Sequence, residues 1–144
     1  MESLHYLLMI NHLMLQRSLL TNIKDTQLAL GQPKVLDYLK DHDGAIQKDI
    51  AIACQIEPAT ITSVLLGMEN KGLIVRKTLN SNRRSLYVYL TDEGRSLANR
   101  VELEFNHIES KALLGFSEEE KSILNALMVR IKNNMMEKKD GFNE

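Results

Sequence analysis

The sequence predicts a mostly α-helical fold with a small β wing: a winged helix-turn-helix core plus N- and C-terminal dimerisation helices. Three observations predict it. Two helix-like segments separated by a short break fill residues 46–71, two β-rich segments flank a polar turn at 79–85, and amphipathic segments occupy both chain ends. We expect an N-terminal dimerisation helix with its connector, a DNA-binding winged core and C-terminal dimerisation helices, at residues 1–30, 31–91 and 92–144.

The first two helices are predicted from apolar spacing and from the residues at their ends. Residues 3–22 carry one broad apolar face, and residues 23–31 are a connector. Pro33 suits the first turn of the second helix, because its missing N–H would have no partner there. Gly44 is a plausible left-handed cap at its end. The broad face of the first helix carries Leu4, Leu7, Leu8, Leu15 and Leu19, and the apolar stripe of the second is Val35, Leu36 and Leu39.

The next two helices form the predicted helix-turn-helix. The third covers residues 46–54, with Ile46, Ile50 and Ala53 inward. The fourth covers residues 58–71 and ends at Gly72. Its apolar residues at helical spacing should pack on helices two and three, and they are Ile61, Leu65 and Met68. The outer face is then left to Ala59, Thr60, Thr62, Ser63, Leu66 and Gly67.

Two strands and two long helices complete the chain. The strands are expected at residues 73–78 and 86–90, with a wing between them that carries Arg83 and Arg84. Thr91 caps a fifth helix that runs to residue 113. Ser117 and Glu120 form a capping box that opens a sixth helix, which runs to residue 138. Its apolar stripe is Ile123, Leu124, Leu127, Ile131 and Met135.

The long apolar stripes of the first, fifth and sixth helices predict a homodimer. Large exposed apolar patches are rare on soluble monomers, so these stripes need a partner surface. A two-fold interface would place two DNA-reading helices about one DNA turn apart, matching a pseudo-palindromic operator. The alternative is that these helices fold back on their own core.

Composition and charge narrow the functional classes. The chain has 144 residues, 44% of them hydrophobic, and one cysteine, which excludes an internal disulfide. No apolar run approaches the roughly 20 residues that span a bilayer, and the N-terminal segment lacks signal-peptide features, so we expect a cytoplasmic protein without membrane contact. The net charge is −1, but residues 46–90 hold six basic and three acidic side chains. This modest local excess lies where DNA binding is predicted.

The candidate DNA-binding residues lie on the fourth helix and the wing. Thr60, Thr62 and Ser63 offer hydroxyls to phosphates or base edges, whereas Arg83 and Arg84 suit phosphates or a narrow minor groove. The competing interpretations are an ordinary helix surface and a solvated turn. For Lys48, Arg76 and Lys77, contact with phosphate and exposure to water remain equal alternatives.

These segments together resemble the MarR (multiple antibiotic resistance regulator) family of dimeric winged helix-turn-helix transcription regulators. The resemblance extends over essentially the whole chain. It is carried by residues 61–65, Lys71-Gly72-Leu73-Ile74, Arg84 and Leu90-Thr91-Asp92-Glu93-Gly94, and Gln47 also matches a common family position. It implies that Gln47 belongs to the DNA-binding set.

The chain departs from the family pattern at several positions. Asn82 replaces the acid that usually precedes the wing arginine, and Ser63 and Gly67 stand where basic residues are frequent. Glu57 replaces a better N-cap and puts an acid near a helix end that should approach phosphates. We therefore expect weaker or more salt-sensitive DNA binding than in a typical member, or an operator that is read by different contacts.

The resemblance also implies a small aromatic or phenolic effector. Such ligands bind in a cleft between the dimerisation helices and the winged core. The candidate lining residues are Tyr6, Met9, His12, Met14 and Tyr38. The competing interpretation is that these side chains belong to the core.

No cofactor, metal or catalytic site is expected. The four histidines form no closely spaced cluster with cysteine or carboxylates, and Cys54 is expected to be a buried, inert thiol rather than a redox sensor. No nucleophile–base pair, Gly-rich phosphate loop or paired carboxylates indicate an enzyme. The predicted function is a dimeric, sequence-specific DNA-binding transcription regulator, a repressor released by a small-molecule effector. The alternative is a winged-helix protein-interaction module, or a regulator with degenerate DNA binding.

Overall fold

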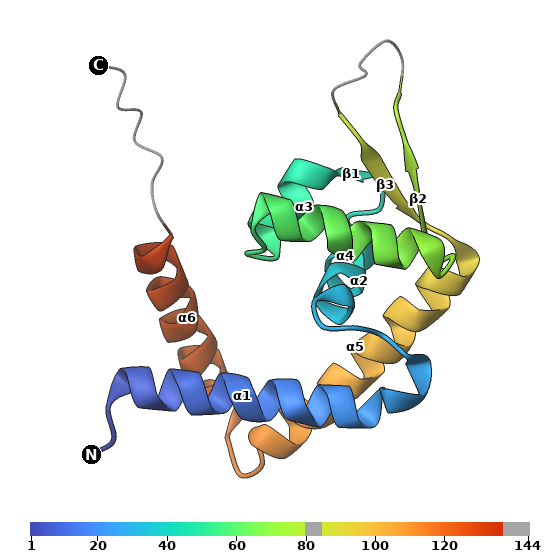
Figure 1. Cartoon of the computed structure of the whole chain (residues 1–144). Coiled ribbons are helices and arrows are strands. Elements are labelled where there is room, and N and C mark those ends of the chain that lie inside the picture. Colours follow the sequence, from blue (N-terminus) through green and yellow to red (C-terminus); the bar gives the residue numbers. More distant parts are fainter. Residues whose placement is uncertain (80–84, 137–144) are drawn as a thin grey trace, which may run out of the picture. The chain divides into compact units, whose positions relative to one another are not determined.

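The computed structural model describes residues 1–79 and 85–136, and in them helices predominate over one small sheet (Figure 1). The predicted fold class is confirmed. The elements are α1 Leu4–Asn22, the 3-10 helix η1 Lys24–Thr26, α2 Gln32–Asp41, β1 Ala45–Ile46, α3 Gln47–Ala53, α4 Pro58–Asn70, β2 Ile74–Lys77, β3 Tyr87–Leu90, α5 Asp92–Ala112 and α6 Glu118–Met135.

The core lies between α2, α3, α4 and the sheet. The stripes predicted for α2 and α4 are confirmed, and every member is at most 2% exposed. In α3 the prediction was wrong for Ala53, which is exposed, and Ala51 and Cys54 are buried with Ile50 instead. Helix α3 has only two turns and begins at Gln47 rather than Ile46, so a small shift in its start changes which residues face the core.

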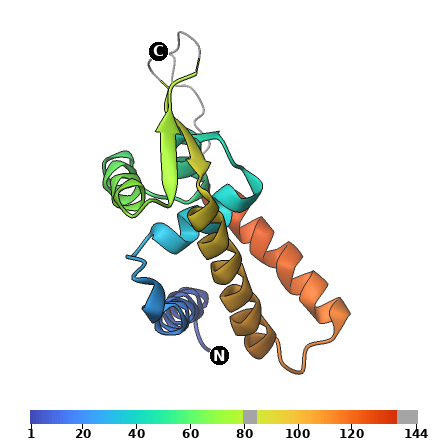
Figure 2. The same cartoon turned by 90° about the vertical axis from the view of Figure 1, so that its right-hand side faces the viewer.

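The sheet has three antiparallel strands in the order β1-β3-β2, so the expectation of two strands was incomplete. Strand β1 pairs Ala45 with Val88, and β2 pairs Arg76 with the other side of the same residue. Two backbone bonds extend the β1–β3 pairing, from the Gly44 N–H to the Val88 carbonyl at 2.8 Å and from the Gln47 N–H to the Leu86 carbonyl at 3.0 Å. Figures 1 and 2 show β2 and β3 as neighbouring strands next to α4.

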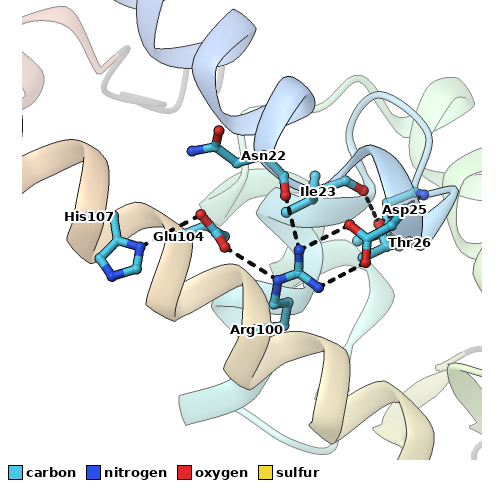
Figure 3. A network of polar contacts seen from close by, with 8 residues as sticks. Asn22, Ile23, Asp25, Thr26, Arg100, Glu104 and His107 are labelled. Atoms are coloured by element: carbon cyan, nitrogen blue, oxygen red, sulfur yellow. Dashed lines mark hydrogen bonds and ion pairs between the residues drawn. The ribbon is translucent and has the colours of Figure 1, made fainter.

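A polar network around Arg100 joins the end of α1 to α5 (Figure 3). The guanidinium donates to both carboxylate oxygens of Asp25, at 2.9 and 3.0 Å, and to the Asn22 carbonyl at 3.0 Å. It also donates to Glu104 at 3.3 Å, one turn further along α5. The expected connector after α1 therefore contains η1, which this bidentate ion pair holds against α5.

The Asp25 carboxyl gives the protein an acid-dependent contribution to stability. The hydrogen bonds from Arg100 lower the pKa of Asp25 below its ordinary value. A carboxyl with a lowered folded-state pKa stabilises the fold above its unfolded pKa, and the contribution is lost as pH falls through the folded pKa. Asp25→Asn should therefore lower the melting temperature at pH 7, and the difference should shrink below about pH 3.9.

Thermal denaturation of both proteins between neutral and acid pH measures this effect. Asp41→Asn is the matched control, because the exposed Asp41 side chain forms no ion pair among the described residues. A difference between Asp25→Asn and the unmutated chain that stays constant with pH would contradict the assignment.

The chain divides into two compact units, residues 1–108 and 109–144. The predicted capping box opens α6: the Glu120 N–H donates to Ser117 Oγ at 3.1 Å, and the Ser117 N–H donates to Glu120 Oε1 at 3.0 Å. Within α6 no described residue is buried, and the predicted apolar stripe is largely exposed. The division of function among residues 1–30, 31–91 and 92–144 remains a prediction.

Among the described residues, no single helix is long and apolar enough to cross a membrane. The segments α3 and α4 pass that test of length and composition only as a pair, and the pair is bent by 111° at its break.

Candidate nucleic-acid interface

Helices α3 and α4 meet in the geometry of a helix-turn-helix. Their axes differ by 111°, within the roughly 90–120° range of that motif. Residues 54–57 make the turn, where Gln55 adopts a left-handed conformation with φ 53°. The Ile56 N–H donates to the Ala51 carbonyl at 2.9 Å and closes the turn. Because Ile61, Leu65 and Met68 are buried, the opposite face of α4 is turned outward.

The outward face of α4 carries hydroxyl groups and little charge. Thr60, Thr62 and Ser63 are all exposed, as predicted, and Leu66 is 46% exposed beside them. Thr62 Oγ1 donates to the Pro58 carbonyl at 3.3 Å, and Ser63 Oγ donates to the Thr60 carbonyl at 2.9 Å. Both hydroxyl protons are thus directed back into the helix, so these oxygens face outward as hydrogen-bond acceptors.

A chain of four side chains joins this face to the sheet. Gln47 Nε2 donates to Thr62 Oγ1 at 3.2 Å, and Arg76 Nη1 donates to Gln47 Oε1 at 3.5 Å. Arg76 also pairs with Glu69, at 2.9 Å from Nε to Oε2 and 3.4 Å from Nη2 to Oε1. The structure therefore brings together three predicted site residues, which come from α3, α4 and β2.

Glu69 is the member of this chain that the sequence did not single out. It lies at the far end of α4 from the predicted hydroxyls, seven residues before Arg76. The Arg76 hydrogen bonds lower the pKa of Glu69 below its ordinary value. The pair is therefore charged at neutral pH with a net charge of zero, and Arg76, whose side chain is 17% exposed, already has an anionic partner. The alternation of side chains along the four-residue strand β2 does not indicate which residue of α4 pairs with Arg76.

Comparison with known proteins shows the fold and a similarity to one family over part of the chain. A family model described as the MarR family matches residues 28–86. This range includes the whole helix-turn-helix and Arg76 of β2. Over this segment the chain is similar to the MarR family. The HTH-type transcriptional regulator PecS of Dickeya dadantii is 40% identical over 87 residues, 60% of this chain and 52% of PecS, so the match spans about half of that relative. The uncharacterised HTH-type regulator YybA of Bacillus subtilis is 28% identical over 112 residues, 78% of this chain and 75% of YybA.

Solved structures of MarR-type regulators have the same fold. A putative MarR-family regulator from Listeria monocytogenes, crystallised with a 26mer DNA, has a TM-score of 0.88 at 24% identity over 93% of this chain and 89% of that one. The regulator SlyA has a TM-score of 0.82 at 28% identity, with 91% and 92% of the two chains covered. MepR of S. aureus, in a DNA-binding conformation, has a TM-score of 0.82 at 28% identity, with 94% and 100% covered. Both relatives, the Listeria monocytogenes protein and SlyA are named as transcription regulators.

The MarR-like junctions predicted from the sequence have structural roles here. Lys71 Nζ donates to the Gln27 carbonyl at 2.7 Å and to Gln32 Oε1 at 2.8 Å, so it connects the end of α4 to the segment before α2 and to the first residue of α2. Thr91 Oγ1 donates to the Gly72 carbonyl at 2.6 Å and accepts from the Gly94 N–H at 3.0 Å, which confirms it as the cap of α5.

The remaining basic candidates differ in their contacts. Lys48 is exposed and forms no ion pair within residues 1–79 and 85–136. The Lys77 ammonium lies 5.4 Å from the centre of the Tyr89 ring, a cation–π distance. Arg83 and Arg84, with their neighbour Asn82, lie outside the described residues.

The candidate effector residues lie on two helices, α1 and α2. Tyr6 and Met9 are 47% and 68% exposed on α1, and His12 is exposed on the same helix. Tyr38 is half-buried on α2, where its ring stacks on His42 with centroids 4.2 Å apart. No hydrogen bond or ring contact joins Tyr38 to the α1 residues in the described part of the chain.

Cys54 is buried at the end of α3, as predicted. A basic residue does lie near it in space: Lys34 Nζ donates to the Cys54 carbonyl at 2.9 Å. Burial nevertheless outweighs this charge and raises the pKa of the Cys54 thiol. Across residues 1–79 and 85–136, no group of three or more metal-binding side chains comes together.

Proposed function

We propose that this protein is a MarR-family transcription regulator, a homodimer that binds a pseudo-palindromic operator in double-stranded DNA and represses transcription by occupying a promoter. The observation that carries this proposal is the exposed hydroxyl face of α4 in a helix-turn-helix bent by 111°. A helix of this kind fits the major groove, where base edges can be distinguished. The DNA complexes solved for the Listeria monocytogenes protein and for MepR of S. aureus support the proposal.

The DNA-facing groups divide by role in this proposal. Thr60, Thr62 and Ser63 enter the major groove, while Lys48 binds phosphate beside α3. Gln47 and Arg76 support α4 from α3 and β2. The wing arginines, Arg83 and Arg84, bind phosphate or the adjacent minor groove on either flank.

Exposed apolar side chains on α1 and α6 support the homodimer. On α1, Leu4 is 59% and Met9 68% exposed, and on α6, Ile123 is 52% and Leu127 47% exposed. Side chains of this size at such exposure on two helices indicate a partner surface. Symmetric pairing of these helices satisfies both copies at once.

Release by a small aromatic or phenolic effector completes the proposed mechanism. Tyr6, Met9, His12 and Tyr38 are its candidate contacts, and ligand binding changes the spacing of the two α4 helices with a coupling of about 1–3 kcal/mol. Titrating phenolic ligands into the operator complex tests this step, and a broad panel without effect would count against it. As a transcription regulator, the protein acts in the cytoplasm in this proposal.

One observation favours a second candidate, a winged-helix module that binds protein. The exposed face of α4 lacks a basic side chain before Lys71, and the Lys71 ammonium is already bound by the Gln27 and Gln32 oxygens. A surface of hydroxyls and one leucine is compatible with a protein partner as well as with base edges.

A salt series on DNA affinity distinguishes the two functions. Nuclease protection on double-stranded fragments, including the region beside the protein's own gene, first identifies the operator. The logarithm of the binding constant should then fall linearly with the logarithm of salt concentration, with a slope of about −0.9 for each phosphate neutralised. A protein-binding module would protect no segment, and that result would overturn the proposal.

A further inference from the structure

The hydrogen bonds that link Glu69, Arg76, Gln47 and Thr62 limit what each of these side chains can bind. The Gln47 amide is used at both ends, because its oxygen accepts from Arg76 at 3.5 Å and its nitrogen donates to Thr62 at 3.2 Å. An amide held this way has one orientation, since rotation by 180° would oppose donor to donor at Arg76. Gln47 is therefore a brace between α3, α4 and β2.

The Thr62 hydroxyl can form one further hydrogen bond, as an acceptor. A threonine hydroxyl has one proton and two lone pairs. The proton is directed to the Pro58 carbonyl and one lone pair accepts from Gln47, so one lone pair remains for an outside group. Phosphate oxygens are acceptors and cannot use that lone pair, whereas the amino groups of adenine N6 and cytosine N4 are donors in the major groove. Ser63, whose proton is directed to the Thr60 carbonyl, has the same preference.

Arg76 is engaged within this arrangement and is poorly placed to bind phosphate. Its guanidinium is paired with Glu69 through two nitrogen–oxygen contacts, at 2.9 and 3.4 Å. Two N–H groups of the guanidinium remain, but the side chain is only 17% exposed and the Glu69 carboxylate beside it repels a DNA phosphate. While Glu69 stays charged, Arg76 holds Gln47 rather than the DNA backbone.

We propose that Glu69 is a positioning residue for base readout: it keeps Arg76 on Gln47, and Gln47 fixes Thr62 as an acceptor for an amino-bearing base in each half-site. This inference rests on the proposed DNA-binding function. It assigns the chain Glu69–Arg76–Gln47–Thr62 to specificity and removes Arg76 from the set of phosphate contacts.

The variant Glu69→Gln separates specificity from general affinity. Affinity is measured on the protected operator fragment and on a scrambled fragment of equal length and composition, each over a salt series. Freed Arg76 should bind phosphate, so the slope on scrambled DNA should steepen by about 0.9. The operator-to-scrambled affinity ratio should fall roughly tenfold, the effect of losing one ordered base contact.

Glu57→Gln is the matched control. Glu57 precedes α4 and is exposed, and its side chain forms no ion pair among the described residues. The substitution removes the same charge from the same surface, so affinity for both fragments should rise by a similar factor while the ratio and the slope stay unchanged. Equal behaviour of the two variants would overturn the inference.

Base analogues test which group Thr62 reads. Each adenine of the half-site is replaced in turn by purine, which lacks the N6 amino group, and each cytosine by a 2-pyrimidinone, which lacks the N4 amino group. One replacement should weaken binding of the unmutated protein roughly tenfold and leave Thr62→Val unaffected. Losses that are the same for both proteins at every position would overturn the readout. Failure of the unmutated protein to bind any DNA would overturn the proposed function as well, whereas operator binding with unaltered Glu69→Gln specificity would overturn this inference alone.

Discussion

Gly94→Ala should destabilise the protein by about 3 kcal/mol or more, the upper range for inserting a group into a packed site. A Cβ at Gly94 would overlap the Leu73 carbonyl oxygen and lie 2.9 Å from the carbonyl carbon. Backbone atoms cannot rotate away as a side chain can. The Leu73 carbonyl is also held in place, because it accepts from the Thr91 N–H at 3.0 Å. The close approach of Leu73, the residue before β2, to the first turn of α5 therefore requires glycine at this position.

Chemical denaturation of Gly94→Ala measures the loss, and Gly115→Ala is its control. Gly115 has open space, with nothing within 4 Å of an added Cβ, but its φ of 86° disfavours other residues. That backbone conformation alone should cost about 1 kcal/mol. If both variants lost the same free energy of unfolding, steric overlap at Gly94 would not be the cause.

Leu127→Glu should abolish the proposed homodimer and weaken operator binding at least about a hundredfold. Leu127 lies in the middle of the apolar stripe of α6 and is 47% exposed. A carboxylate enclosed in an apolar interface loses its hydration without gaining a partner, a cost of several kcal/mol. A single protomer then binds one half-site, with far fewer phosphate and base contacts than the dimer.

Sedimentation and operator titration measure both consequences, with Val129→Glu as the control. Val129 is 40% exposed and lies two residues further along α6, about 200° around the helix. The same charge should be tolerated there because that face is opposite the stripe. A dimeric Leu127→Glu protein, or a monomeric Val129→Glu protein, would contradict the assignment of the interface.

The long helices could be predicted from the sequence because each repeats its signal. In α4, Ile61, Leu65 and Met68 recur at helical spacing, and their burial confirms which face is turned outward. Local hydrogen-bonding signals were equally informative: Thr91 and Ser117 cap α5 and α6 as expected. The hydroxyl face of the candidate interface follows directly from this inside–outside assignment.

Short elements and long-range contacts could not be predicted in the same way. Strand β1 has two residues, too few for an alternation, and it exists because β3 offers a free edge. The Arg76–Glu69 pair joins residues on a strand and a helix whose approach only the folded chain defines. The apolar content of α3 was clear, but its two turns could not define the register that buries Ala51 instead of Ala53.

Two charged side chains connect the end of α1 to both α4 and α5. Arg100 holds Asn22 and Asp25 against α5, and Lys71 holds Gln27 and Gln32 against the end of α4. A displacement of the 22–32 segment is therefore transmitted to α5 through the Arg100–Asp25 ion pair and to α4 through hydrogen bonds of Lys71 with two neutral oxygens. Ion pairs near water are screened by dissolved ions, so the coupling of this segment to α5 should weaken as the salt concentration rises.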